Sequence, residues 1–406
     1  MKKPELLAPA GSLIKLKYAL TYGADAVYIG GESFSLREAA ENFSIAEIKE
    51  GIEFAHNLGK KVYITANIIP HNKDLLGFCE YVKEVYELGA DAIIVSDLGL
   101  FDLVKSVAPD FEVHISTQAN NVNYASANMW YKLGAKRVIL ARELSLEEIK
   151  EVRDNIPEDM DIECFIHGAM CISYSGRCLM SNYLTNRDSN MGACSHPCRW
   201  KYYLMEEKRP GEYFPVFENE RGTFIYNSKD LCMIEHIPEL IKAGISSFKI
   251  EGRVKSEYYV ATITKAYRDA IDAYFNGEEY SEKFGAELTK VSHREYTKGF
   301  FFGKPDANQQ LYTTNSYVRD FDLVGVVDGY DEEKKMLVVT QRNKFFKGDE
   351  LEVLIPGQDF KTIKVEKMFN ENMEEIESCP HATMKLYIPC DFACPEYSIL
   401  RKEKNN

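Results

Sequence analysis

Four stretches of this chain repeat the same junction between the end of a helix and the start of a strand. They read YGADAVYIGG (22–31), LGADAIIVSD (88–97), LGAKRVILAR (133–142) and AGISSFKIEG (243–252). In each, a glycine suited to the left-handed cap of a helix C-terminus precedes a short run of strand-forming residues. A unit of helix, glycine and strand that recurs in this way predicts an alternating α/β fold.

Eight strand-like runs appear when this pattern is followed along the chain. Amphipathic helical patterns lie between most of them, for example at residues 44–59 and 144–157. Eight strands that alternate with helices predict a (β/α)8 barrel of the TIM type over residues 1–280. The expected strands lie near residues 5–9, 26–30, 62–66, 92–96, 112–117, 137–141, 162–167 and 246–251.

The seventh unit departs from the pattern because a long insertion follows its strand. About sixty residues separate IECFIHG (162–168) from the helical sequence LCMIEHIPELIKAG (231–244), whereas such connections are usually a few residues long. The insertion spans residues 168–230, and Cys232 begins the next predicted helix. Active sites of these barrels lie at the C-terminal ends of the strands, so we expect the insertion there. It contains Cys171, Cys178, Cys194 and Cys198.

A second domain is expected after the last helical pattern of the barrel, at residues 256–277. Residues 281–319 are expected to connect the two domains. Over residues 320–402, strand-like runs alternate with Gly, Asp and Pro turns. This texture predicts a small all-β domain, most simply a β-barrel.

The composition limits where the chain is expected to work. A net charge of −14 argues against nucleic-acid binding over the whole surface, because such binding depends on Lys and Arg; we expect no DNA partner. No run reaches the 18 or so apolar residues of a membrane span, and no signal peptide is evident. We therefore expect a cytoplasmic protein without membrane contact, whose ten cysteines stay reduced rather than forming disulfides.

Polar side chains gather at the ends of the predicted strands. Alternation in IECFIHG places Glu163 and His167 on the face toward the barrel interior, and buried charges need partners, for which Lys249, Arg253 and Arg142 are expected. One reading is a charge-balanced plug; the other is a catalytic set of Glu163, His167, Arg142 and Lys249 beside a substrate that carries carboxylates. Residues expected to bind substrate are Asn67, His114, Gln118, Glu251 and Arg253.

The cysteine spacing alone leaves three kinds of site open. Four thiolates from a long loop and a helix start suit a [4Fe–4S] cluster, while structural zinc and a catalytic thiol are the alternatives. Cys79 is expected to be a small buried residue. Cys379, Cys390 and Cys394 form a set of three thiols without a clear fourth, which favours a structural role over a second metal site.

Six distinctive blocks run along most of the chain: ECFIHGAMC (163–171), GRCLMS (176–181), GACSHPCRWKYYL (192–204), SKDLCMIEHIPELI (228–241), FKIEGRVKSEYY (248–259) and SHREYTKGFFFGKP (292–305). They resemble peptidase family U32, the collagenase-like family, and within it most closely the tRNA hydroxylation branch. The resemblance implies a part in making 5-hydroxyuridine at position 34 of tRNA, with prephenate as the source of the hydroxyl.

The resemblance also implies a cofactor. A sister branch, which acts in oxygen-independent ubiquinone synthesis, carries a [4Fe–4S] cluster whose ligand spacing matches Cys171, Cys178, Cys194 and Cys232. Cys198 is the alternative fourth ligand. Arg177, which lies between the first two cysteines, is then expected to face the cluster or the substrate.

The expected partners follow from the same branch. The anticodon loop of tRNA is expected to enter beside HREYTKGFFFGK (293–304), where aromatic and basic residues interleave as stacking on unpaired bases requires. The same Phe run equally suits a seam between the domains. A second, paralogous U32 subunit is a further expected partner.

Two other functions are weighed against tRNA hydroxylation. One is a peptidase with a cysteine nucleophile and His167 as base, although the chain has no HExxH or GxSxG motif. The other is a non-catalytic RNA-binding partner whose iron–sulfur cluster is structural.

Overall fold

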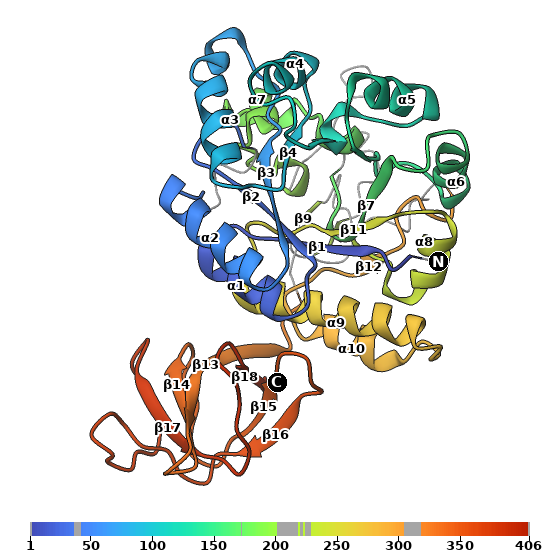
Figure 1. The fold of residues 1–406 in the computed structure, drawn as a ribbon. Coiled ribbons are helices and arrows are strands. Elements are labelled where there is room, and N and C mark those ends of the chain that lie inside the picture. The colour runs from blue at the N-terminus through green and yellow to red at the C-terminus, as the bar shows by residue number, and fades with distance from the viewer. Residues whose placement is uncertain are drawn as a thin grey trace.

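The computed structural model describes residues 2–35, 42–171, 173–200, 218–219, 222–223, 229–303 and 318–404. Within these residues, the N-terminal domain is a barrel of eight parallel strands (Figure 1). The eighth barrel strand, β11, pairs with β7 on one side and with β1 on the other, which closes the barrel as predicted. The strands are β1 (Glu5–Pro9), β2 (Ala26–Gly30), β3 (Lys61–Ala66), β4 (Ala92–Val95), β5 (Val113–Ile115), β6 (Arg137–Ile139), β7 (Asp161–Ala169) and β11 (Ser247–Ile250).

Helices cover the outside of the barrel, and local sequence sets their ends. Ser44 and Ser145 each form a capping box with the glutamate three residues later, which satisfies amide groups that a helix start leaves unpaired. Gly134 adopts a left-handed conformation after α5, with a φ of 100°. The helices are α1 (Leu13–Thr21), α2 (Ile45–Asn57), α3 (Phe78–Glu87), α4 (Leu98–Val107), α5 (Tyr124–Leu133), α6 (Leu146–Asp154), α8 (Ile237–Lys242) and α9 (Glu257–Phe275).

The helix expected over residues 231–244 is shorter than predicted. Residues Asp230–Cys232 instead form a strand, β10, which pairs antiparallel with the end of β7. The helix α8 starts only at Ile237, and Pro238 lies in its first turn. Proline is tolerated there because the amide hydrogens of the first turn have no partner within the helix. Cys232 therefore lies in a strand and does not begin the helix.

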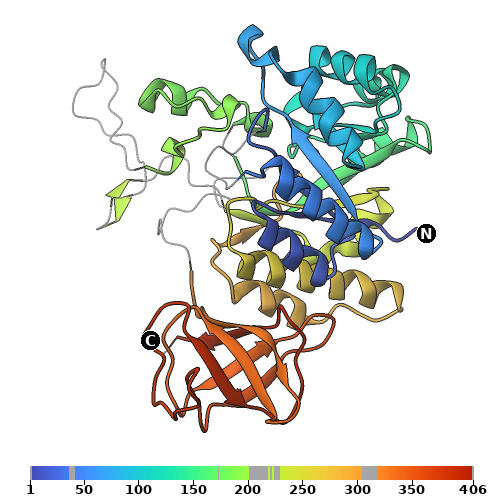
Figure 2. The same ribbon diagram turned by 60° about the vertical axis from the view of Figure 1, so that its left-hand side comes forward.

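The described part of the insertion projects from one end of the barrel (Figure 2). It contains one short helix, α7 (Met180–Thr185). Single 3-10 turns surround this helix: η3 (Tyr174–Gly176), η4 (Ser189–Met191) and η5 (Pro197–Arg199). The two-stranded β8 (Glu218–Asn219) and β9 (Gly222–Thr223) follow, and residues 201–217 lie outside the described part. Other 3-10 turns of the barrel are η1 (Asn72–Leu75), η2 (Thr117–Ala119) and η6 (Ile234–His236).

The segment expected to connect the domains belongs to the barrel over much of its described length. Its helix α10 (Glu282–Thr289) packs beside α9, and its strand β12 (Tyr296–Thr297) pairs with β10. The C-terminal domain then forms an antiparallel six-stranded sheet, a half-barrel, in the order β16-β15-β18-β13-β14-β17, with a hydrophobic core of its own. Its strands are β13 (Phe321–Asp331), β14 (Met336–Gln341), β15 (Glu350–Leu354), β16 (Lys361–Lys364), β17 (Lys385–Pro389) and β18 (Ile399–Glu403).

Buried polar contacts join the two domains. The hydroxyl of Tyr22, on the barrel, donates to the backbone oxygens of Leu354 and Tyr397 at 2.9 Å each. Arg401 is fully buried and pairs with Glu287 of α10 and with Glu352 of β15. These contacts fix the C-terminal domain against the α9 and α10 side of the barrel.

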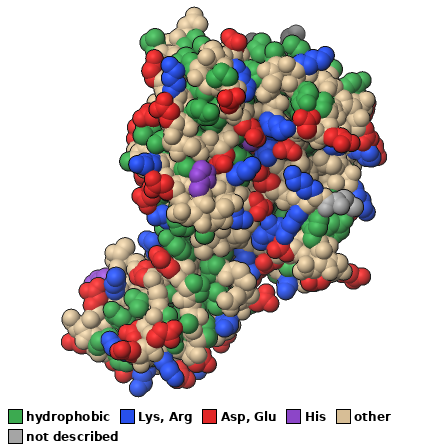
Figure 3. All heavy atoms as spheres, viewed as in Figure 1, with side chains coloured by type: hydrophobic (Ala, Val, Ile, Leu, Met, Phe, Trp, Pro, Cys, Tyr) green, Lys and Arg blue, Asp and Glu red, His purple; other side chains and the backbone are tan. Residues whose placement is uncertain are grey.

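The outer surface carries charges of both signs. On the face seen in Figure 3, Lys and Arg lie interspersed with Asp and Glu rather than gathered in one large basic area. Within the described residues, no helix is both long and apolar enough to cross a membrane.

Candidate active site at the mouth of the barrel

One cavity of about 240 Å³ lies at the C-terminal ends of the barrel strands, and the insertion forms part of its wall. Most of the residues expected in the site line this cavity. They are Asn67, Gln118, Arg142, Lys249, Glu251 and Arg253 from the barrel, and Cys171, Cys178, Cys194 and Cys198 from the insertion. The sequence therefore identified most of the lining, but five expected residues lie elsewhere: Glu163, His114, His167, Arg177 and Cys232.

Lys249 is a buried cation of the cavity lining, 4% exposed. Its Nζ lies 2.6 Å from Oε1 of Glu163, as expected, and 4.4 Å from the centre of the Tyr28 ring. Burial lowers the pKa of Lys249, while the charge of Glu163 opposes this shift. The arrangement gives the cavity a fixed amino group that a buried carboxylate supports from below.

Glu163 lies beneath the cavity and is fully buried. Its other oxygen lies 3.0 Å from Nη1 of Arg137, and Arg137 also contacts Glu5 at 2.6 Å. Burial alone would raise the pKa of Glu163, but Lys249 and Arg137 hold it below its usual value. The reading as a charge-balanced plug fits these ion pairs, while the catalytic role of the set stays a prediction. The sequence analysis did not predict Arg137 in this layer. Strand alternation could have indicated it, because Arg137 and Ile139 of β6 point to the same side.

His114 belongs to the same buried layer and does not line the cavity. Its Nε2 lies 2.8 Å from Oε1 of Glu112, and its ring packs edge-on against Tyr63 at 4.8 Å. Burial lowers the pKa of His114, and the nearby Arg137 lowers it further. Its position under the cavity gives no direct contact with a bound substrate.

His167 points away from the barrel interior, so the expected orientation was wrong. A β-bulge causes this: Phe165 pairs with Lys249, but the next residue of β11, Ile250, pairs with His167, so β7 carries one extra residue. An extra residue reverses the side to which later side chains point. The ring of His167 packs against Tyr267 of α9 at 5.4 Å, and burial lowers its pKa to about 3.

Arg142 and Glu251 form an ion pair on the wall of the cavity. Nη2 of Arg142 lies 3.0 Å from Oε2 of Glu251, and the guanidinium stacks over Phe165 at 4.0 Å. Arg142 therefore pairs with Glu251 and not with Glu163. The pair places one cation and one anion side by side at the cavity.

Arg253 contacts oxygen atoms of neutral side chains instead of the expected Glu163. Nη1 donates to Ser35 Oγ at 2.6 Å and to Thr65 Oγ1 at 2.9 Å, and Nη2 donates to Asn42 Oδ1 at 3.1 Å. Gly30 makes room for this group, because a Cβ there would lie 2.6 Å from Nη2 of Arg253. The glycine at the end of β2 therefore has a steric role in the site.

The cysteines of the insertion share the cavity, whereas Cys232 does not. Cys232 is buried beneath α9, with the Tyr267 hydroxyl 3.9 Å from its Sγ. None of the ten cysteines is part of a disulfide. Within the described residues, no three His, Cys, Asp or Glu side chains meet as a ready metal-binding group. The structure thus gathers Cys171, Cys178, Cys194 and Cys198 around one cavity and leaves Cys232 apart.

Hydrogen bonds fasten the insertion over the mouth. Ser175 donates to Glu143 through both its backbone amide and its hydroxyl at 2.6 Å. Nε of Arg177 donates to the carbonyl oxygen of Gln118 at 2.9 Å. Arg177 does not line the cavity, so it anchors the insertion to η2 where a contact with substrate was expected.

The aromatic run near the end of the barrel domain is largely buried. His293, Arg294 and Phe301 are each less than 10% exposed, and only Phe302 of the Phe run is strongly exposed, at 56%. The backbone oxygen of Phe301 accepts a hydrogen bond from Leu146 of α6. The segment therefore packs on the barrel and offers little surface for unpaired bases, and residue 304 lies outside the described part.

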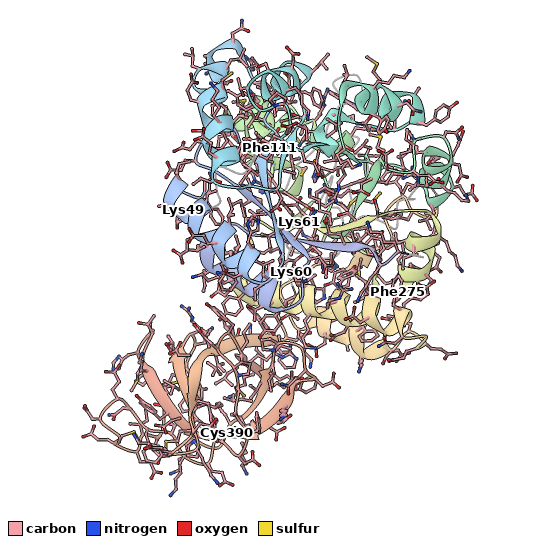
Figure 4. The ribbon with its side chains drawn as sticks, in the orientation of Figure 1. Lys49, Lys60, Lys61, Phe111, Phe275 and Cys390 are labelled. Carbon is pink, nitrogen blue, oxygen red and sulfur yellow. The ribbon has the colours of Figure 1, made fainter. Side chains whose placement is uncertain are left out.

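The cysteines of the C-terminal domain lie in its core, and their structural role stays a prediction. Cys379, Cys390 and Cys394 are all buried in its hydrophobic core. Figure 4 places Cys390 inside that domain, far from the barrel. Cys79, on α3, is only partly buried.

Comparisons with known proteins agree with this architecture. The chain matches the model of Peptidase family U32 over residues 11–311 and that of the Peptidase family U32 C-terminal domain over residues 319–401. The first match covers the barrel and its insertion, and the second covers the half-barrel.

Three curated relatives add names. The chain is 42% identical to tRNA hydroxylation protein P1 of Bacillus subtilis (strain 168), over 99% of this chain and 96% of that protein. It is 41% identical to tRNA hydroxylation protein P of Escherichia coli (strain K12), over 96% of this chain and 94% of that protein. It is 39% identical to the 23S rRNA 5-hydroxycytidine C2501 synthase of E. coli, over 71% of this chain and 42% of that protein. Both domains and the cavity residues thus lie within matched sequence, and the chain belongs to peptidase family U32.

Proposed function

We propose that this protein hydroxylates uridine 34 of tRNA to 5-hydroxyuridine and takes the hydroxyl from prephenate. Two relatives that match nearly the whole chain are named tRNA hydroxylation proteins, and a third is named as a synthase of a 5-hydroxylated rRNA base. A cytoplasmic location fits both a tRNA substrate and ten cysteines of which none is part of a disulfide. A paralogous U32 subunit stays a prediction.

The observation that carries this proposal is the lining of the cavity. Arg142, Lys249 and Arg253 bring three cationic groups to one small cavity. Prephenate is a dicarboxylate, and guanidinium and ammonium groups bind carboxylates through charge-assisted hydrogen bonds. Lys249 would bind one carboxylate from the floor, because Glu163 and the ring of Tyr28 fix its amino group in place.

The thiols that line the same cavity suit an iron–sulfur cluster. Cysteines outside any disulfide on one loop are the soft donor set that a [4Fe–4S] cluster requires, and assembly of the cluster would draw their sulfurs together. The proposal assigns Cys171, Cys178, Cys194 and Cys198 as ligands, because these four line the cavity and Cys232 does not. Such a cluster supplies or accepts single electrons when bound.

The overall reaction sets what the residues must do. Replacing the C5–H bond of uracil by C5–OH is a two-electron oxidation, so the donor, which loses a hydroxyl from carbon, is reduced by two electrons. The protein's part is to hold both reactants in one cavity and to exclude water. Arg142 and Lys249, together with Phe165 between them, form the wall best suited to orient the donor.

The position of His167 argues against the peptidase alternative. It required a thiol of the insertion beside His167, but His167 lies behind β7 against α9 and does not line the cavity that the four thiols share. The pKa of His167, lowered to about 3 by burial, also makes it a poor base.

Nucleoside mass spectrometry of tRNA tests the function. A deletion strain without paralogues, complemented with the wild-type gene, should regain nucleosides derived from 5-hydroxyuridine at position 34. Lys249→Met should fail to restore them, whereas Lys298→Met should restore them, because Lys298 pairs with Glu235 outside the cavity. Unchanged nucleosides in the uncomplemented deletion strain would exclude tRNA hydroxylation. A non-catalytic RNA-binding partner would show RNA binding without loss of the modification.

A further inference from the structure

The cavity has two chemically different sides. The ends of β6, β7 and β11 bring Arg142, Lys249 and Glu251 to one side, and Arg253, which follows β11, reaches Thr65 of β3. The ends of β3 and β5 bring neutral polar side chains to the other, which we call the amide shelf: Asn67, Ser116, Thr117 and Gln118. A dicarboxylate suits the charged side, so the amide shelf needs a different ligand.

The amide shelf is a built structure. Asn67 Nδ2 donates to Ser116 Oγ at 3.3 Å, and Ser116 Oγ also accepts from the backbone amide of Gln118 at 3.3 Å. Thr117 Oγ1 donates to the backbone oxygen of Leu140 at 3.1 Å. The carbonyl of Gln118 accepts from Arg177 of the insertion. These contacts hold the backbone of Gln118 from both sides and fix where its side chain begins.

The side chain of Gln118 carries an acceptor that the described residues do not satisfy. Only 8% of Gln118 is exposed, and its Oε1 has no hydrogen-bond partner within the described part of the chain. Leaving a buried amide oxygen unpaired is costly. A ligand that donates a hydrogen bond at this point would remove that cost. The carboxylate groups of the donor have no hydrogen to donate at neutral pH, so they cannot serve.

We propose that the amide shelf is a nucleobase subsite in which the amide of Gln118 pairs with the edge of the target uracil. This inference rests on the proposed function and assigns the position of the RNA base within the cavity. Uracil offers the N3–H donor beside the O4 acceptor, and an amide offers the matching acceptor and donor. A base must leave its stack to enter such a cavity, and flipped bases are read along this edge. Asn67 and Ser116 lie beside Gln118 as further polar contacts for the base.

Removing the hydrogen at N3 of uracil tests the pairing. The experiment measures binding of the full-length protein to two synthetic RNA hairpins by fluorescence anisotropy. One carries uridine at the target position of the loop, and the other carries N3-methyluridine. The wild-type protein should bind the uridine hairpin about tenfold more tightly, which one lost hydrogen bond at a buried acceptor accounts for.

Three variants locate the effect. Gln118→Leu should bind both hairpins equally, at about the affinity of the wild type for the methylated one. Gln118→Glu keeps an acceptor and should keep the preference for uridine. Arg142→Gln, on the charged side, should also keep the preference. A Gln118→Leu protein that still prefers uridine would overturn the subsite, as would a wild type that binds both hairpins equally. Failure of the wild type to bind either hairpin would instead contradict the RNA substrate itself, and the subsite with it.

Discussion

Nζ of Lys249 lies 2.6 Å from Oε1 of Glu163, and both side chains are at most 5% exposed. Removal of the carboxylate leaves a buried ammonium with less compensation, which typically costs 3–5 kcal/mol. Glu163→Gln should therefore lower the free energy of unfolding by about 3 kcal/mol in urea titrations. The exposed Glu371→Gln serves as control and should change it little. A double variant with Lys249→Met should recover part of the loss; a fully additive loss would contradict direct coupling of the pair.

The same layer predicts a loss of stability in acid. Burial alone would raise the pKa of Glu5, but Arg137, Tyr63 and Ser247 lower it to about 2, from 4.5 for an unperturbed group. Because the folded pKa is the lower one, Glu5 stabilises the fold above pH 4.5, and this contribution of roughly 3 kcal/mol is lost as the pH falls toward 2. Urea titrations between pH 6 and pH 3 measure the slope. Glu5→Gln should flatten it, and an unchanged slope in that variant would contradict the assignment.

The iron content of cysteine variants tests which cysteines bind the proposed cluster. After anaerobic purification, the wild type should carry about four irons per chain and a broad visible absorption. Serine variants of Cys171, Cys178, Cys194 and Cys198 should each lose most of the iron. Cys232→Ser and Cys390→Ser should keep it, since neither thiol lines the cavity. Loss of iron from Cys232→Ser together with retention in Cys198→Ser would reverse the assignment of the fourth ligand.

Gly30 should be intolerant of even one added methyl group. A Cβ would lie 2.2 Å from Ser35 Oγ and 2.6 Å from the Arg253 guanidinium, so Gly30→Ala must displace that cation. Under the proposed function, we expect the KM for prephenate to rise about tenfold, the effect of losing roughly 1.4 kcal/mol of binding. Gly329→Ala is a matched control, because nothing lies within 4 Å of its added Cβ. Equal kinetics for the two variants would show that Arg253 does not hold the donor.

Arg401 should stabilise the junction between the domains. It is fully buried and lies 2.6 Å from Glu352 and 2.8 Å from Glu287, on opposite sides of that junction. Arg401→Met leaves both carboxylates with less positive charge, and we expect a loss of about 3 kcal/mol in the free energy of unfolding. The exposed Arg319→Met should have little effect. A loss of similar size in both variants would rule out a specific role for Arg401.

The sequence predicted the barrel well because its signals are local and repeated. Each predicted strand ends within two residues of the observed one, since a glycine cap followed by a β-branched run marks both the helix end and the strand. The Lys249–Glu163 pair was also predictable, because inward positions at neighbouring strand ends must meet in a closed barrel.

The errors share a physical cause in long-range pairing. The bulge that turns His167 outward depends on how β7 matches β11, and alternation within one strand cannot reveal it. Likewise, Cys232 became part of a strand because β10 finds the end of β7 as a partner. Arg142 pairs with Glu251, and Arg253 donates to Ser35 and Thr65. No spacing in the sequence indicates these contacts.

The hydrogen bonds between the insertion and the barrel link the cysteines of the insertion to Gln118. Under the proposed function, a shortage of iron would therefore affect Gln118 as well as the cluster. Arg177 lies in the loop between Cys171 and Cys178 and also holds the carbonyl of Gln118. Under the proposed function, a chain that failed to acquire a cluster would lose order at Gln118, the proposed base-reading residue, as well as the proposed redox centre. Under the proposed function, an iron-starved cell would hold a pool of inactive protein that does not sequester tRNA.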